Sequence, residues 1–150
     1  MSNKDKQGCN PNTVLPNELI NAYKKTNFDV FTEPLFTLNI GVFSERLASM
    51  YNENSVETAC FITAYNPFSK ALTLEENEIS QNRLMENLVK SGNQFFEGIG
   101  LDPTGEWDGE SSFLVLGISK QEASDLGNEF KQNAVVWCGK NCVPQLLFLR

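Results

Sequence analysis

The chain has 150 residues, of which 41% are hydrophobic, and this length and composition suit one domain with its own core. Its 19 acidic residues outnumber its 12 lysines and arginines, and the formal net charge of −7 opposes binding to nucleic-acid phosphates. The sequence contains no histidine, which excludes Ser-His-Asp and Cys-His catalysis and two-histidine metal motifs.

Residues 1–13 are polar and are predicted to be a flexible segment, and residues 14–150 are predicted to form a single α+β domain. The first residues lack the apolar stretch and cleavage site of a secretory signal, and nowhere do 18 apolar residues follow one another. We therefore expect a cytoplasmic protein that neither spans a membrane nor binds nucleic acid.

The N-terminal part of the domain is predicted to contain two short helices and a pair of strands. Leu19, Ile20 and Tyr23 recur at helical spacing within a helix over 16–25. Residues 28–31 and 35–40 follow as a strand pair, or as one broken strand, at a sheet edge, because Glu33-Pro34 interrupts them. A helix over 45–51 comes next.

A strand over 58–65 is predicted to lie in the centre of the sheet, because it is rich in apolar, β-branched and aromatic residues. Asn66-Pro67 ends it, since proline has no N–H group for the sheet. The pattern Thr73-Leu-Glu-Glu76 is a capping box and predicts a helix over 74–90.

The C-terminal half is predicted to hold two hairpins and one helix. Strands over 94–100 and 112–118 are joined by a short acidic loop, and strands over 133–137 and 143–149 form the second hairpin. Between the hairpins, Ser119-Lys-Gln-Glu122 is another capping box, which opens a helix that ends near residue 131.

From residue 58 onward the predicted order is strand, helix, strand, strand, helix, strand. This order is typical of a ferredoxin-like split βαβ core, in which two helices cover one face of an antiparallel or mixed sheet. The N-terminal helices and a C-terminal β-hairpin would be additions to this α+β core. A three-layer α/β sheet is the alternative.

The junction of the central strand and the following helix, residues 63–77, is the predicted ligand site. Asn77, Gln81, Leu84 and Leu88 share one helical face, so the two amides are expected near Thr63, Asn66 and Ser69. Free N–H groups and the positive end of the helix dipole lie at the same place. Alternatively, these amides only hold the 66–72 loop in shape.

The four cysteines are Cys9, Cys60, Cys138 and Cys142, and they are expected to be reduced thiols. A zinc site would require all four to converge, and the alternative is a Cys138–Cys142 disulfide across the hairpin. The acidic loop does not match an EF-hand; we interpret it as a solvated loop in which Trp107 packs on the sheet. Neither a metal nor a cofactor is predicted.

Several short motifs occur in a characteristic order: Phe61-Ile-Thr-Ala-Tyr-Asn-Pro-Phe-Ser69, Glu76-Asn77 with Leu84, Gly100 through Trp107 to Glu110-Ser111, and Phe130-Lys-Gln-Asn-Ala134. Together they resemble the bacterial domain-of-unknown-function family 3293 over about residues 23–137. One departure is Asp108-Gly109, which separates Trp107 from Glu110-Ser111. The resemblance implies no activity. It nominates the following positions: Thr63, Asn66, Ser69, Glu76, Asn77, Trp107, Glu110, Gln132 and Asn133.

Three functions are therefore open. The first is binding of a small polar, nucleotide-like or carboxylated ligand at residues 63–77, with Gln132 and Asn133 closing the pocket and Trp107 available for stacking. The second is a hydrolase or transferase without histidine, in which Glu76 or Glu110 acts as general base. The third is a protein-interaction or inhibitor domain that presents its acidic surface to a basic partner.

Overall fold

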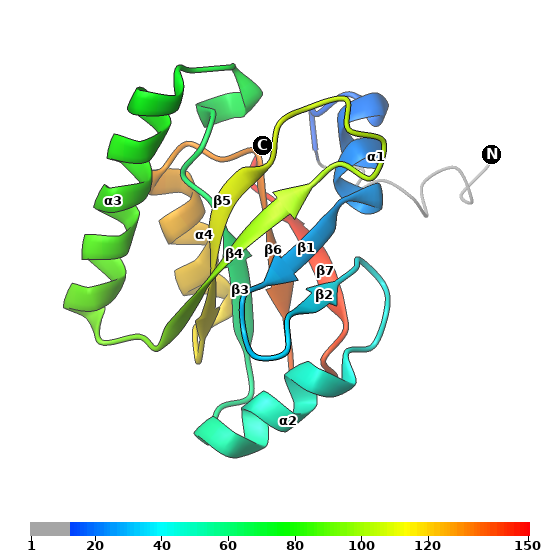
Figure 1. Cartoon of the computed structure of the whole chain (residues 1–150), viewed down its shortest axis with the longest axis vertical. Helices are drawn as coiled ribbons and strands as arrows, with labels where there is room; N and C mark the ends of the chain where they lie inside the picture. The colour runs from blue at the N-terminus through cyan, green and yellow to red at the C-terminus, as the bar shows by residue number, and fades with distance from the viewer. Residues whose placement is uncertain (1–12) are drawn as a thin grey trace.

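The computed structural model describes residues 13–150, and in this part of the chain one curled antiparallel sheet is combined with α-helices (Figure 1). Predictions about residues 1–12, including any role of Cys9, lie outside the described residues. The elements are, in order, α1 (Asn17–Lys25), β1 (Asn27–Val30), β2 (Phe36–Leu38), α2 (Glu45–Asn54), β3 (Ala59–Ile62), the 3-10 turn η2 (Pro67–Ser69), α3 (Leu74–Ser91), β4 (Phe95–Leu101), β5 (Glu110–Leu116), α4 (Lys120–Glu129), β6 (Ala134–Cys138) and β7 (Pro144–Phe148).

The strands are ordered β2-β1-β4-β5-β3-β6-β7, and every neighbouring pair is antiparallel. The two predicted hairpins are confirmed as β4–β5 and β6–β7. The strand pair predicted before residue 40 is confirmed as β1–β2, with β2 at the edge. The sheet is therefore antiparallel rather than mixed.

Helices α3 and α4 cover one face of this sheet. Leu84 and Leu88 of α3 and Ala123 and Leu126 of α4 join a single buried cluster with side chains such as Val115 of β5. The capping boxes predicted at the starts of both helices are present, so each helix begins where its sequence signal indicated. The other face of the sheet forms a second core.

The opposite face is concave because the sheet curls until its two edges approach each other. The segment after β2 reaches the start of β7, where the Gly41 N–H donates to Pro144 O and the Ser44 N–H to Cys142 O, each at 2.9 Å. Helix α2 closes the lower end of this half-barrel in Figure 1, and it contributes Leu47 to the second buried cluster. The upper end lies beside α1 and stays more open.

Two element boundaries differ from the sequence prediction by three residues, and the others agree within two residues. The central strand ends at Ile62 rather than at residue 65, because the Thr63 hydroxyl turns back to accept the N–H of Tyr65 at 3.0 Å. Helix α2 continues beyond residue 51 to Asn54, and it ends at Ser55 in the left-handed conformation (φ 55°). The longer helix buries Tyr51, whose hydroxyl donates to the carbonyls of Cys138 and Gly139.

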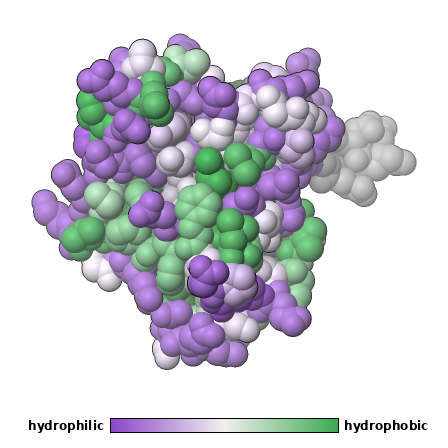
Figure 2. All heavy atoms as spheres, viewed as in Figure 1, coloured by the Kyte–Doolittle hydropathy of each residue, from purple (hydrophilic) through white to green (hydrophobic). Residues whose placement is uncertain are grey.

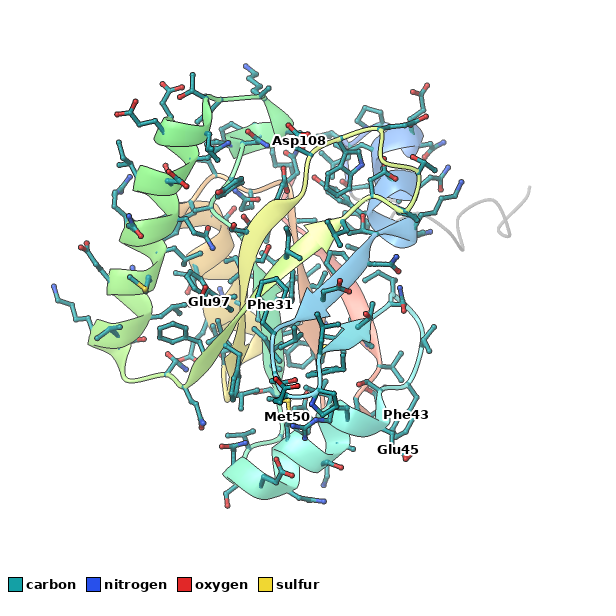
Figure 3. The ribbon with its side chains drawn as sticks, in the orientation of Figure 1. Phe31, Phe43, Glu45, Met50, Glu97 and Asp108 are labelled. Atoms are coloured by element: carbon teal, nitrogen blue, oxygen red, sulfur yellow. The ribbon has the colours of Figure 1, made fainter. Side chains whose placement is uncertain are left out.

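The surface is mixed rather than uniformly polar. Figure 2 shows apolar side chains gathered across the middle of the view, where β1 and β4 lie in Figure 1. Phe31, at the end of β1 and labelled in Figure 3, is 51% exposed. None of the helices in residues 13–150 has the length and apolar character needed to cross a membrane.

Candidate functional site

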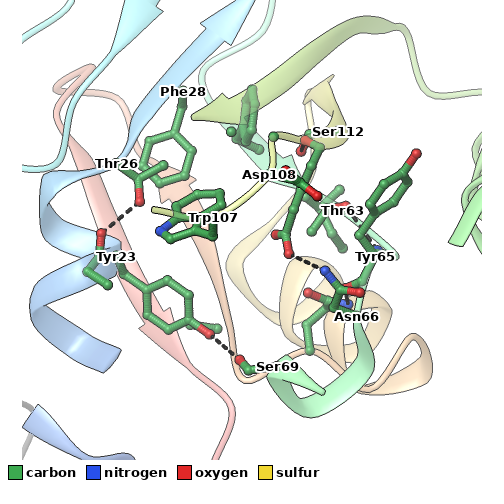
Figure 4. A pocket seen from close by; sticks show the side chains of 18 of the residues that line it. Tyr23, Thr26, Phe28, Thr63, Tyr65, Asn66, Ser69, Trp107, Asp108 and Ser112 are labelled. Carbon is green, nitrogen blue, oxygen red and sulfur yellow. Dashed lines mark hydrogen bonds between the residues drawn. The ribbon is translucent and has the colours of Figure 1, made fainter. Parts of the chain in front are cut away.

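A cavity of about 590 Å³ lies at the upper, open end of the curled sheet (Figure 4). Four segments distant in sequence form it: α1, the loop over 63–72 after β3, the acidic loop over 102–109, and the concave-facing residues of the strands. The site predicted at residues 63–77 is thus one wall of a larger pocket. A volume of this size is within the usual range for small-molecule sites.

The cavity exists because the concave face changes from large to small side chains along the strands. Gly100 of β4 lies opposite Phe28 on one side and Glu110 on the other, and Ser112 of β5 lies opposite Gly98. Side chains on the same face of neighbouring strands normally fill this space, and here glycine and serine leave it open. At Gly100 a Cβ would not clash, since its nearest neighbour, a Thr26 methyl, would lie at 3.7 Å, an ordinary van der Waals contact.

A reciprocal pair of amides holds the turn after β3. The Asn66 N–H donates to Asn77 Oδ1, and Asn77 Nδ2 donates to Asn66 Oδ1, both at 2.8 Å. Asn66 has left-handed backbone angles (φ 47°), which asparagine tolerates better than most residues. The Asn66 Oδ1 also accepts the Leu72 N–H at 3.0 Å. Asn77 is 4% exposed, and its side chain holds Asn66 in place at the cavity wall.

Asn66 also positions Glu110, the most enclosed carboxylate of the cavity wall. Asn66 Nδ2 donates to Glu110 Oε2 at 2.8 Å, the bond drawn between Asn66 and the neighbouring carboxylate in Figure 4. Burial raises the pKa of Glu110, and the hydrogen bond from Asn66 lowers it by less. Glu110 is thus a group that can take up or release a proton inside the cavity.

Ser69 connects the loop to α1 and to the C-terminal strand region. Its hydroxyl lies 3.2 Å from the Tyr23 hydroxyl and accepts a hydrogen bond from Asn133 Nδ2 at 2.8 Å. Asn133 in turn accepts from Arg150 at 3.2 Å. Burial raises the pKa of Tyr23, so this phenol is protonated at neutral pH and is available for hydrogen bonding.

The acidic loop covers the cavity from the side of β4 and β5. Asp102 shapes it by accepting the N–H groups of Thr104 at 3.0 Å and Glu106 at 2.8 Å, and these bonds lower the pKa of Asp102. Trp107 is 36% exposed and lines the cavity; in Figure 4 its indole lies on the same side as Phe28 and Tyr23. Glu106 and Asp108 stand at the exposed rim.

The structure brings most of the predicted site residues to this cavity. Its wall includes Thr63, Asn66, Ser69, Asn77, Trp107, Glu110 and Gln132. Thr63 and Gln132 have structural partners as well: the Thr63 hydroxyl donates to Ser111 O at 2.6 Å, and Gln132 Nε2 donates to Tyr65 O at 3.1 Å and to Phe130 O at 3.3 Å.

Three predicted residues do not line the cavity. Gln81 is buried on the helix-covered side of the sheet, where its Oε1 accepts the Ala64 N–H at 2.9 Å. Asn133 is one step removed, behind Ser69. Glu76 is engaged in its capping box: the Thr73 N–H donates to Glu76 Oε1 at 3.0 Å, and this bond lowers the pKa of Glu76. A general base should have access to a substrate, so Glu110 is better placed than Glu76.

Sequence reasoning missed the α1 side of the cavity and part of its floor. Tyr23 of α1, Thr26 directly after this helix, and Phe28 and Phe61 of the sheet all line it. The glycine and serine at positions 100 and 112 were the local signal for an unfilled space. Nothing local identifies Tyr23, whose partner Ser69 is 46 residues away in the sequence.

The chemical equipment of the site is carboxylate, amide, hydroxyl and aromatic. Among the described residues, no group of three or more Asp, Glu, Cys or His side chains converges as a metal ion would require. Cys60, Cys138 and Cys142 are buried free thiols, and the Cys138–Cys142 disulfide is not formed. Burial raises the pKa of Cys138 to about 12, so this thiol is not a nucleophile at neutral pH.

Comparison with known proteins confirms the predicted resemblance. Residues 62–135 match the family model described as "Protein of unknown function (DUF3293)". The matched stretch begins at the end of β3 and extends into β6, so it contains both the Asn66–Asn77 pair and Glu110 but not Tyr23. Neither a curated protein nor a solved structure matches the chain.

Proposed function

We propose that this protein binds a small polar organic ligand in the cavity between α1, the 63–72 loop and the acidic loop. The observation that supports this best is the cavity itself, which has about 590 Å³ of space lined by aromatic side chains and a few ordered polar groups. Ligand sites are typically concave, largely apolar, and supplied with a small number of oriented polar groups. Asn66, held by Asn77 and bonded to Glu110, is such an oriented group.

A neutral or cationic ligand fits this lining better than a nucleotide or a carboxylate. Among the described residues, the charged side chains of the cavity wall are Glu106, Asp108 and Glu110, and no lysine or arginine of this part of the chain lines it. A phosphate or carboxylate inside would face negative charge without a basic partner. Trp107 offers a flat surface for stacking an aromatic ring of the ligand.

We also infer that β3, α3, β4, β5, α4 and β6 form a ferredoxin-like core. The spatial order β4-β5-β3-β6 and the burial of α3 and α4 against one face support this inference. In this arrangement the ligand cavity lies on the face opposite these helices, and α1 and the acidic loop complete its walls. A cytoplasmic location is proposed as well, supported by the buried free thiols.

A thermal-shift screen with nucleosides, amino acids, sugars and other small metabolites tests the binding proposal. A ligand that binds only the native state stabilises it by RT ln(1 + [L]/Kd), so the midpoint temperature rises with ligand concentration. Two cavity variants should abolish the shift: Gly100→Leu, which fills the cavity, and Trp107→Ala, which removes its flat wall. Leu35→Ala is the matched control, because Leu35 is 51% exposed and does not line the cavity.

The outcomes separate ligand binding from the protein-interaction alternative. A shift that is lost in both cavity variants and kept in Leu35→Ala supports ligand binding. A shift that persists in both cavity variants refutes this site. If no compound in a broad screen shifts the wild type, the binding proposal fails, and the protein-interaction alternative becomes the better one.

Glu110 favours a second candidate, a reaction that uses this carboxylate as general acid or base. Burial raises its pKa toward the range in which a carboxyl group exchanges protons efficiently near neutral pH. Once a ligand is found, its chemical turnover in wild type and Glu110→Gln distinguishes catalysis from binding alone. Product formation that requires Glu110 would support the enzyme, and stable binding without turnover would refute it.

A further inference from the structure

The polar groups of the cavity are arranged to accept hydrogen bonds from a ligand rather than to donate them. The hydroxyls of Thr26, Thr63 and Ser112 each donate to a backbone carbonyl, of Ala22, Ser111 and Glu110 respectively. Both contacts of the Gln132 amide nitrogen are also to backbone carbonyls. The donors of these four side chains are thus used inside the protein, and at these positions a ligand meets acceptors.

Glu110 is the strongest of these acceptors. Its Oε2 receives the Asn66 amide, and Oε1 has no donor among the described residues. Oε1 is also absent from the fully buried polar atoms that lack a partner in this part of the chain, so it is accessible from the cavity. A carboxylate in this position, half-buried and with one oxygen left to pair, suits a charged N–H donor.

The rest of the wall reinforces this preference. Glu106 and Asp108 add negative charge at the rim, and the net charge of −7 favours the approach of cations from solution. The rings of Tyr23, Trp107 and Phe28 line the same cavity, and the face of an aromatic ring attracts a cation.

A bare metal ion does not fit the same features. The described residues contain no group of three or more acidic or thiol side chains that could hold one, so the carboxylates around the cavity do not converge on one point. A cavity of about 590 Å³ also offers far more space than one ion needs. A larger cation, whose body contacts the rings while its nitrogen reaches Glu110, uses both parts of the site.

We propose that the ligand of this cavity is an organic cation, a protonated amine, amidine or guanidine, whose N–H groups pair with Glu110 and whose body packs against Trp107. This inference rests on the proposed function, since it specifies the chemical class of the ligand that the cavity binds. It also excludes the carboxylated and phosphorylated ligands that the helix N-terminus alone would suggest.

The test uses probes of matched shape and different charge. One set is benzamidinium, benzamide and benzoate, and a second is tryptamine, tryptophol and indole-3-acetate. Each is titrated into the ¹⁵N-labelled full chain at pH 7.5, and the backbone amide of Gly100 and the indole N–H of Trp107 are followed by NMR. The cations should shift these signals at concentrations at least about tenfold lower than their neutral and anionic counterparts, because a charge-assisted hydrogen bond is lost in the latter.

Glu110→Gln and Glu97→Gln are the matched variants. Both remove one carboxylate from the β4–β5 hairpin, but Glu97 is exposed, does not line the cavity, and lies well away from Asp108 in Figure 3. Glu110→Gln should weaken binding of the cationic probes about tenfold, and Glu97→Gln should leave it within about twofold.

The inference is overturned if neutral or anionic probes bind as tightly as cations, if both variants weaken binding equally, or if no probe shifts the cavity signals. The proposed function is judged separately. It survives any of these results when the broader screen yields a ligand of another charge whose binding is abolished by Gly100→Leu and by Trp107→Ala. It fails when that screen yields no ligand.

Discussion

Replacing Asn77 with alanine should destabilise the protein by about 2–4 kcal/mol. The side chain makes two hydrogen bonds of 2.8 Å to Asn66, and Asn77 is only 4% exposed. Losing the bond to Asn66 Oδ1 costs roughly 0.5–1.5 kcal/mol, and leaving the Asn66 N–H without an acceptor costs about 1–3 kcal/mol, so the midpoints sum to about 3 kcal/mol. This loss is a large part of the 5–15 kcal/mol that is typical of a folded domain, to an order of magnitude.

Urea unfolding followed by circular dichroism and by tryptophan fluorescence measures this loss. Coincident transitions in the two signals justify a two-state free energy of unfolding, and the midpoint and slope give its value. Asn82→Ala is the matched control, since Asn82 is an exposed residue of the same helix, and it should change the free energy by about 0.5 kcal/mol or less. If Asn77→Ala costs no more than Asn82→Ala, the amide pair does not hold the turn.

Asn77→Asp separates the two bonds of the pair. The ionised carboxylate can still accept the Asn66 N–H, but it offers no donor to Asn66 Oδ1 and places a charge in a buried position. Acidification restores a neutral carboxyl group with one donor. The difference in unfolding free energy between Asn77→Asp and the wild type should therefore shrink as the pH falls. A constant difference between pH 8 and pH 4 would contradict the reciprocal amide contact.

Three further predictions follow from single contacts. In the wild type, burial raises the folded-state pKa of Glu110 above its ordinary 4.5. The stability due to its protonated form is therefore present below pH 4.5 and is lost as the pH rises through the raised pKa. Urea unfolding from pH 4 to 8 should show that Glu110→Gln removes this decline. Gly98→Ala should cost about 1–3 kcal/mol, because its Cβ would lie 2.3 Å from Asp29 O, whereas Gly100→Ala should be tolerated; thermal unfolding of the two variants compares them directly. Ser119→Ala should cost about 1 kcal/mol through loss of the α4 cap, measured in the same way.

Local signals in the sequence were sufficient for much of the fold. Both capping boxes, Thr73–Glu76 and Ser119–Glu122, act over three residues, and they identified the starts of α3 and α4. The two hairpins followed from short loops between apolar segments. The curl of the sheet was not predictable in this way, because it depends on contacts such as Gly41 with Pro144, which join elements at opposite edges.

The same distinction explains which site residues were found. Asn66 and Asn77 lie 11 residues apart in one strand–turn–helix unit, so helical periodicity could bring them together. Gln81 follows one turn later on the same stripe of α3, yet it contacts Ala64 and is absent from the cavity wall. Because α3 covers the face opposite the cavity, only the first turn of this helix extends far enough to reach it. Periodicity identifies which side chains of a helix face the sheet, but it does not tell which of them lie beyond the end of the sheet and reach the cavity.

Glu110 reduces the stability of the folded protein, and a residue that does so points to a function at its position. Burial raises its pKa, so ionisation at neutral pH reduces the stability of the folded state. A glutamine at this position would still accept the Asn66 amide and would avoid the charge. Residues that cost stability are concentrated at functional sites. If Glu110→Gln both raises the stability at pH 7.5 and weakens binding of cationic probes, the cost of this carboxylate is explained by a ligand; if it lowers the stability, Glu110 serves the fold.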